Sequence, residues 1–162
     1  MEETKNELQV MEGGLMKSDD SLLTSKNSRR YCTMDLTKDE NKIALYNSLQ
    51  QCDVLLNDIK GQVIEMKDVF IEEKEVPVRD EKTDEVIYNE ETGEIETKIH
   101  FRTIIYGTDG QTYVSSAYGI YNSLKQIIPV FGNPSEENII KVRVGEKATR
   151  NGRKSLILTV EK

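Results

Sequence analysis

The chain has 162 residues, with 22 Lys and Arg against 29 Asp and Glu, so its formal net charge is −7 at pH 7. This length suits one domain with a tail, and we expect a cytoplasmic protein because the sequence has neither an apolar run of membrane-spanning length nor the start of a signal peptide. The two cysteines, Cys32 and Cys52, follow no metal-site or disulfide-rich pattern, and an evenly spread negative charge would argue against a nucleic-acid partner.

Residues 1–30 are polar and lack aromatic residues, which predicts a flexible N-terminal extension. As an alternative, its apolar residues would fit a short amphipathic helix that binds a partner. These residues are Leu8, Met11, Leu15 and Met16.

A short strand is expected over 31–36 and a helix directly after it. Thr37 and Glu40 have the spacing of a capping box, in which each side chain bonds the other residue's backbone N–H. The apolar residues Ile43, Tyr46 and Leu49 recur at helical spacing, so we expect them on one face of this helix.

The stretch 62–76 alternates apolar and polar residues and predicts a long strand, with a β-bulge where the alternation slips near Lys67. The following residues, 77–97, predict an acidic hairpin excursion from the fold. Within it, 86–88 would pair with 94–96 across a turn that contains Gly93.

The negative charge is concentrated in this region. Residues 72–97 contain 11 acidic and three basic residues, which is −8, whereas 98–162 contain 10 basic and five acidic residues, which is +5. One acidic insertion therefore sets the sign of the whole chain, and the net charge does not exclude nucleic acid as a partner.

The remaining sequence predicts strands around tight turns and one helix with an apolar face of 3.6-residue period. The strands are 98–106, 111–116, 138–144 and 155–161, and the helix is 117–128. Together with 62–76 this gives five strands with a helix between the third and fourth. The fold class we predict is mainly β: a five-stranded OB-fold barrel within 31–162, an N-terminal helix and a long acidic β-hairpin. A β-sandwich or an open α+β sheet fits the order less well.

Three stretches carry a family resemblance: Gly61–Glu65, Arg102–Ser115, and Ile140–Gly145 followed by Gly152 and the last strand. Over residues 60–162 the sequence resembles the small OB-fold single-stranded DNA-binding proteins of Firmicutes phages with protein-primed replication. The resemblance implies sequence-independent binding and protection of single-stranded DNA during phage replication, in the bacterial host cytoplasm. The chain departs from this pattern in its long N-terminal extension and its larger acidic hairpin.

Binding of single strands needs cations along the phosphates and aromatic faces for the bases. We expect bases to stack on Tyr106 and Tyr113 and phosphates to follow the cations of the outer strand faces and of the last hairpin. These candidate cations are Lys98, Arg102, Lys141, Arg143, Lys147, Arg150, Arg153 and Lys154. We expect the acidic hairpin to face away from DNA and to contact another copy of the chain or a replication protein.

Other interpretations stay open at this point. Tyr106 and Tyr113 would pack equally well at a barrel rim, and Phe101 and Tyr121 are expected in the core. A single histidine and the absence of the glycine-rich motifs that bind nucleotides predict no enzyme, no cofactor and no metal site. The alternative function is an OB-fold module that binds proteins and not DNA.

Overall fold

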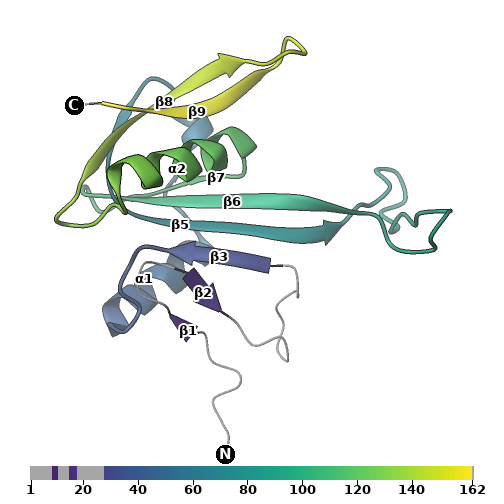
Figure 1. Cartoon of the computed structure of the whole chain (residues 1–162), viewed down its shortest axis with the longest axis horizontal. Coiled ribbons are helices and arrows are strands. Elements are labelled where there is room, and N and C mark those ends of the chain that lie inside the picture. The colour runs from purple at the N-terminus through teal and green to yellow at the C-terminus, as the bar shows by residue number, and fades with distance from the viewer. Residues whose placement is uncertain (1–8, 11–14, 18–27, 162) are drawn as a thin grey trace, which may run out of the picture.

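The computed structural model describes residues 9–10, 15–17 and 28–161 (Figure 1). These residues form a mixed α/β fold in which one curled sheet carries two helices. In chain order the elements are β1 (Gln9–Val10), β2 (Leu15–Lys17), β3 (Ser28–Cys32), α1 (Asp39–Gln50), β4 (Val54–Leu55), a 3-10 turn (Leu56–Asp58), β5 (Val63–Pro77), β6 (Thr97–Gly107), β7 (Thr112–Ser115), α2 (Tyr118–Phe131), β8 (Ile140–Ala148) and β9 (Lys154–Val160).

The sheet runs in the order β1-β2-β3-β5-β6-β7-β4, and β8 pairs with both β5 and β9. The predicted order of five strands with a helix between the third and fourth is confirmed by β5, β6, β7, α2, β8 and β9. Among the described residues, however, β9 does not pair with β7, so the sheet does not close into the predicted five-stranded barrel. Helix α2 lies along the free edge of β9, where the Leu158 N–H donates to Ser123 Oγ over 3.0 Å.

Each face of the central strands has its own hydrophobic core. Alternate residues of β6 point to opposite faces, so Ile105 packs in the core under α2 while Ile104 packs in the core under α1. The larger core contains Leu124 of α2 and Val142 of β8, and the smaller contains Leu45 of α1. Figure 1 shows the two helices on opposite sides of β5 and β6.

Helix α1 begins later and faces differently than the sequence predicts. Lys38 is the N-cap residue without a side-chain cap, and the Thr37 hydroxyl instead donates to Asp35. Ile43 and Tyr46 are 60% and 62% exposed, and Leu45 is the residue that enters the core. The predicted face is therefore wrong for Ile43 and Tyr46, whereas Leu49 packs against the core together with Leu45. Apolar residues at helical spacing occur on both sides of this helix, and the sheet contacts the side that contains Leu45.

The bulge predicted in the first long strand is confirmed as a register shift between Met66 and Asp68 in the pairing of β5 with β6. Helix α2 extends past the predicted end at residue 128, through Pro129, to Phe131, and Gly132 follows it at φ +84°. At the other end of α2, a Cβ on Gly119 would lie 2.0 Å from the Leu156 carbonyl oxygen, so glycine is what lets this helix approach β9.

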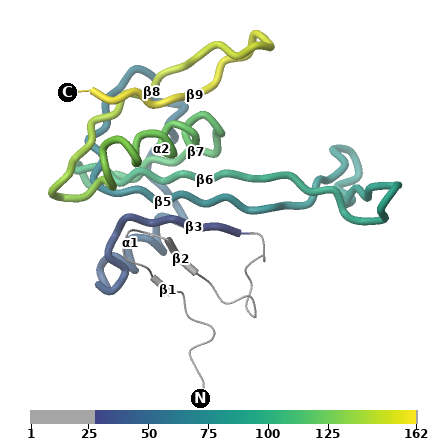
Figure 2. Tube along the Cα trace, viewed as in Figure 1, coloured from purple at the N-terminus to yellow at the C-terminus, as the bar shows by residue number. Residues whose placement is uncertain are grey.

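Beyond the body, β5 and β6 continue as a two-stranded ribbon into residues 77–97, which we call the acidic arm (Figure 2). Two turns share one hydrogen-bond pattern there: Asp80 Oδ1 and Asn89 Oδ1 each accept from the N–H groups two and three residues further along. Asp84 and Gly93 provide the left-handed residue of each turn, at φ +59° and +73°. The predicted pairing of 86–88 with 94–96 is confirmed by the bridge between Tyr88 and Ile95.

The predicted N-terminal extension, 1–30, is described only in part. β1 and β2 add antiparallel strands to β3, which pairs with β5, so the described residues before Tyr31 continue the sheet. Leu15 and Met16 lie in β2, not in the alternative helix. Leu8 and Met11 of that alternative lie outside the described residues.

Candidate nucleic-acid interface

The turn between β8 and β9 concentrates positive charge. Residues 147–154, which we call the basic hairpin, contain four cations and no acidic residue: Lys147, Arg150, Arg153 and Lys154. All four side chains are exposed, and none has an ion-pair partner within the described part of the chain. The neighbouring Glu146 is paired with Lys60 over 3.1 Å. The hairpin therefore presents exposed cations that phosphate groups can contact.

The remaining predicted cations differ in how free they are. Lys141 is exposed on the outward side of β8, and Lys98 is exposed at the base of the acidic arm, opposite Val76. Arg143 is also exposed, but it donates to the Gly61 carbonyl and pairs with Glu161 over 3.1 Å. The hydrogen bond to Glu161 and the attraction of its negative charge raise the pKa of Arg143 above its ordinary value. The structure thus leaves Lys141 and Lys98 exposed and holds the Arg143 guanidinium between Gly61 and Glu161.

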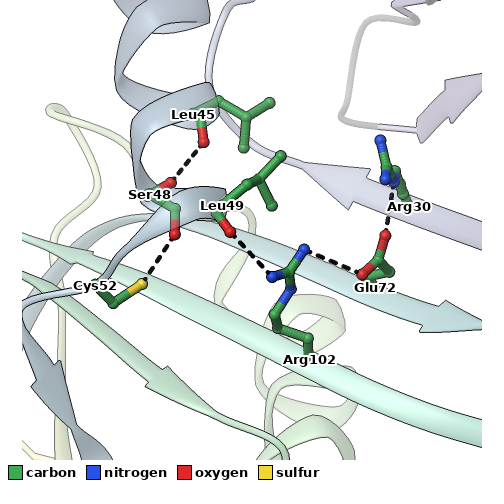
Figure 3. Close-up of polar contacts among 7 residues, drawn as sticks. All are labelled: Arg30, Leu45, Ser48, Leu49, Cys52, Glu72 and Arg102. Atoms are coloured by element: carbon green, nitrogen blue, oxygen red, sulfur yellow. Dashed lines mark hydrogen bonds and ion pairs between the residues drawn. The ribbon is translucent and has the colours of Figure 1, made fainter.

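Arg102 has a structural environment that the sequence did not reveal (Figure 3). Its guanidinium lies 3.4 Å from Glu72 Oε1 and donates to the Leu49 carbonyl over 3.2 Å. Glu72 is only 3% exposed, and its other carboxylate oxygen accepts from Arg30 over 2.7 Å. The structure therefore gives Arg102 a structural role at a buried carboxylate and at the end of α1, and its contact with phosphates stays a prediction.

The two tyrosines predicted as stacking platforms are buried, on opposite faces of the sheet. Tyr106 is 5% exposed in the core under α1, where its hydroxyl bonds Ser48, and this burial raises its pKa. Tyr113 is 7% exposed and pairs in register with Ile105, so it lies in the core under α2. Burial raises the pKa of Tyr113 to about 12, with a further contribution from its hydrogen bond to Asp109. Neither ring presents a face to a base, and the stacking prediction for both is wrong.

A different set of rings lies at the surface: Phe101 of β6 with Tyr118 and Tyr121 of α2, which we call the aromatic cluster. The Phe101 ring centroid lies 4.5 Å from that of Tyr121 and 5.2 Å from that of Tyr118. Phe101 and Tyr121 are half-buried, and Tyr118 is 58% exposed. Phe101 and Tyr121 were expected in the core, so the cluster was missed. The available signal was a pair of tyrosines three residues apart in the first turn of a helix.

Helix α2 connects the aromatic cluster with the start of β9. The first turn of α2 contacts the start of β9, where a Cβ on Gly119 would meet Leu156 and Ser155, the residues next to Lys154. Lys125 lies over the Tyr121 ring at 5.7 Å from its centroid. Lys125 is thus the cation that the structure places at the rings, and the basic hairpin ends one residue before the segment of β9 that α2 contacts.

One acidic residue also belongs to this region. Glu73 accepts a hydrogen bond from the Tyr121 hydroxyl and lies 3.9 Å from Arg29. Burial raises the pKa of Tyr121 to about 12, and the bond to Glu73 adds to the shift. The Glu73 carboxylate thus contacts a hydroxyl and a guanidinium.

The described residues contain no group of three or more potential metal ligands, and no helix among them is long and apolar enough to cross a membrane. In comparisons with known proteins, a family model for phage single-stranded DNA-binding proteins of the Phi29 type matches residues 24–161. The match spans every element from β3 to β9. No curated protein and no solved structure matches the chain.

Proposed function

Because the chain belongs to the phage single-stranded DNA-binding protein family, a family of non-enzymatic proteins, we propose that it coats and protects single-stranded DNA during phage DNA replication. Binding is independent of sequence and takes place in the cytoplasm of the bacterial host. The observation that carries this proposal is the family match over residues 24–161. The exposed cations of the basic hairpin support it, since a nonspecific single-strand binder draws much of its affinity from phosphate contacts.

In this proposal β5–β9 act as an OB-fold frame whose open edge is covered by α2. The phosphates follow the basic hairpin and Lys141, the cations that are free to contact them. Lys98 and Arg143 extend this path at most weakly: one lies at the base of the acidic arm, and the other is already paired. If the four hairpin cations each neutralise one phosphate, the slope of log K against log salt is about −3 from this element.

The direct test is a fluorescence titration of the protein with oligo-dT and with the matching duplex over a range of salt. We expect preference for the single strand and a linear decrease of log K with log salt. Binding weaker than millimolar at low salt, or equal binding of single and double strands, would contradict the proposal. It would favour the alternative, an OB-fold module that binds protein partners only.

A matched pair of variants tests the basic hairpin. Lys147→Gln with Lys154→Gln removes two hairpin charges, and Lys38→Gln with Lys42→Gln removes two exposed charges at the start of α1. We expect the hairpin pair to reduce the salt slope by about 1.4 and the α1 pair to leave it unchanged. Equal effects of both pairs would show that the protein attracts DNA only through its overall charge.

We propose that the acidic arm stays off the DNA and contacts a basic surface on a neighbouring copy of the chain or on a replication protein. It contains eight acidic and two basic residues over 77–97 and projects from the body as a ribbon. Replacing 77–97 by Asn-Gly preserves the pairing of Val76 with Lys98 and closes the ribbon with a two-residue turn.

If the arm contacts a neighbouring copy, this shortened variant coats long single strands with lower cooperativity while its affinity for a short oligonucleotide at physiological salt is retained. The triple variant Glu90→Gln, Glu91→Gln and Glu94→Gln keeps the arm and removes part of its charge, so it should reproduce part of the effect. Unchanged cooperativity together with an unchanged salt dependence in the shortened variant would refute this role.

A further inference from the structure

From the geometry we propose that the aromatic cluster of Phe101, Tyr118 and Tyr121 is the platform on which the bases of single-stranded DNA stack. This inference rests on the proposed function, because it assigns the base-contacting part of the same binding surface. It also places the bases at the junction of β6 and α2, away from Tyr106 and Tyr113, whose rings are buried.

The cluster has the shape of a platform with an exposed ring supported by two inner ones. Tyr118 packs edge-on against Phe101 with an interplanar angle of 65°, and its centroid lies 5.9 Å from that of Tyr121. The two half-buried rings hold Tyr118 in place, while its own side chain remains largely exposed. Ile99, on the same face of β6 and 50% exposed, continues the apolar surface toward the arm. A base stacked on this surface would cover apolar area that the fold leaves open to water.

The charges around the cluster favour a nucleotide over a purely apolar ligand. Lys125 lies against Tyr121 from within α2, and Lys154 lies at the start of β9, which the first turn of α2 contacts. The first turn of α2 contains no acidic residue, so the positive end of the helix dipole is not offset there. Lys125 therefore lies beside the rings on the α2 side, whereas Glu73 and Glu75 of β5 lie opposite Phe101 and Ile99. In this proposal the phosphate backbone passes on the α2 side, next to Lys125 and the positive end of the helix.

The cluster also fixes the start of α2 to β6, and the experiment must separate that role from base stacking. Tyr118 suits this purpose because it is the most exposed ring and its removal leaves Phe101 packed on Tyr121. Tyr118→Leu removes the aromatic face, and Tyr118→Phe keeps the face and removes only the hydroxyl. Tyr46→Leu is the matched control, since Tyr46 is a helical tyrosine of similar exposure on α1.

We expect Tyr118→Leu to weaken oligo-dT binding by about 5- to 150-fold, the range that corresponds to the loss of one base stack. Its slope of log K against log salt should stay that of the unmodified protein, because no cation is lost. Tyr118→Phe and Tyr46→Leu should bind as the unmodified protein does. Thermal melting of each variant verifies that the fold is retained.

A second measurement uses a reporter ring. The chain contains no Trp, so Phe101→Trp introduces one tryptophan whose emission can be excited selectively. Stacking predicts quenching of this emission by oligo-dT, with a titration midpoint equal to that of the binding curve. A Phe101→Trp protein that binds oligo-dT without any change in tryptophan emission would overturn the platform.

The outcomes distinguish this inference from the proposed function. If the unmodified protein binds oligo-dT and Tyr118→Leu binds equally well, the platform is wrong and the function stands. If the unmodified protein does not prefer single strands, the proposed function fails and the platform fails with it. If Tyr118→Leu and Tyr46→Leu weaken binding equally, the effect does not arise at the cluster and the platform is again wrong.

Discussion

Arg102 provides the sharpest test of whether the structure assigns the cations correctly. It was predicted to bind phosphate, but its guanidinium joins the buried Glu72 carboxylate of β5 to the Leu49 carbonyl at the end of α1. The last turn of α1 contains no basic residue of its own, so Arg102 provides the cation that the negative end of the helix favours. Arg102→Met retains the apolar stem and removes these contacts.

The cost of this substitution follows from the contacts that remain. A hydrogen bond to a charged group contributes about 1.5–3 kcal/mol. Leaving a buried charge with no partner costs about 3–5 kcal/mol, but Glu72 keeps its 2.7 Å contact with Arg30 in the variant. Arg102 is also about one-third exposed, which weakens its ion pair. We therefore expect a loss of about 2–3 kcal/mol in the free energy of unfolding.

Two assays separate this role from DNA binding. In a protein of this size the loss corresponds to a decrease in Tm of about 4–12 °C. Because the contact is at the end of α1, amide hydrogen exchange in Asp39–Gln50 should accelerate more than exchange in β8. The slope of log K against log salt for oligo-dT should not change. Lys98→Met, on the same face of β6, is the matched control, and its Tm should stay within about 1–2 °C of the unmodified protein.

The opposite pattern would refute the reasoning. If Arg102→Met melts like the unmodified protein and its salt slope decreases by about 0.7, then one phosphate contact has been lost and the guanidinium binds DNA. The contact with Glu72 would then be incidental. A decrease in both Tm and salt slope would show that DNA competes with Glu72 for the same guanidinium.

Three further predictions concern the body of the fold. Burial raises the pKa of Asp68, so the charged form of this residue destabilises the native state at neutral pH. This cost disappears as the pH falls through the raised pKa toward about 3.9, the pKa of an aspartate in the unfolded chain. Asp68→Asn keeps an acceptor for the Thr33 hydroxyl and should melt above the unmodified protein at pH 7, with a difference that shrinks on acidification; a constant difference would contradict this. Gly119→Ala, which in an open helix would stabilise by about 1 kcal/mol, should instead lower the Tm because its Cβ meets Leu156, whereas Gly145→Ala has room. Tyr106→Phe should lose about 0.5–1.5 kcal/mol in denaturant unfolding and leave the oligo-dT affinity unchanged; weaker DNA binding would restore Tyr106 to the interface.

The strands and their order were predictable because apolar and polar residues alternate along β8 and along much of β5. Ile140, Val142 and Val144 alternate with exposed residues, and the structure buries all three. Alternation fails as a guide where both faces are covered. Alternation correctly places the side chains of Tyr106 and Ile105 on opposite faces of β6. It cannot show that α1 packs over the face to which Tyr106 belongs.

The aromatic cluster escaped prediction for the converse reason. Phe101 lies on the same face of β6 as Ile105, so its pattern is that of a core residue. β6, however, runs beyond the end of α2 that covers this face, and Phe101 lies where the cover ends, next to the exposed Tyr118. Whether a strand extends beyond the helix that covers it depends on how the two elements pack, and a local sequence pattern does not contain this information. The exposure of the hairpin cations was predictable because charged side chains in a turn between two strand ends remain in water and need no ion-pair partner.

The separation of charges along two ribbons explains how a chain of net charge −7 suits a DNA-binding role. Phe101 is four residue steps of extended strand, or about 13 Å, from the base of the arm at Thr97. This exceeds the screening length of about 8 Å at physiological salt, so the acidic turns beyond Thr97 act only weakly on a phosphate at the platform. At 0.01 M salt the screening length grows to about 30 Å, and the arm then repels the strand. We therefore expect the net charge of the chain to weaken DNA binding at low ionic strength, and the cations of the proposed binding surface to determine the affinity at physiological salt.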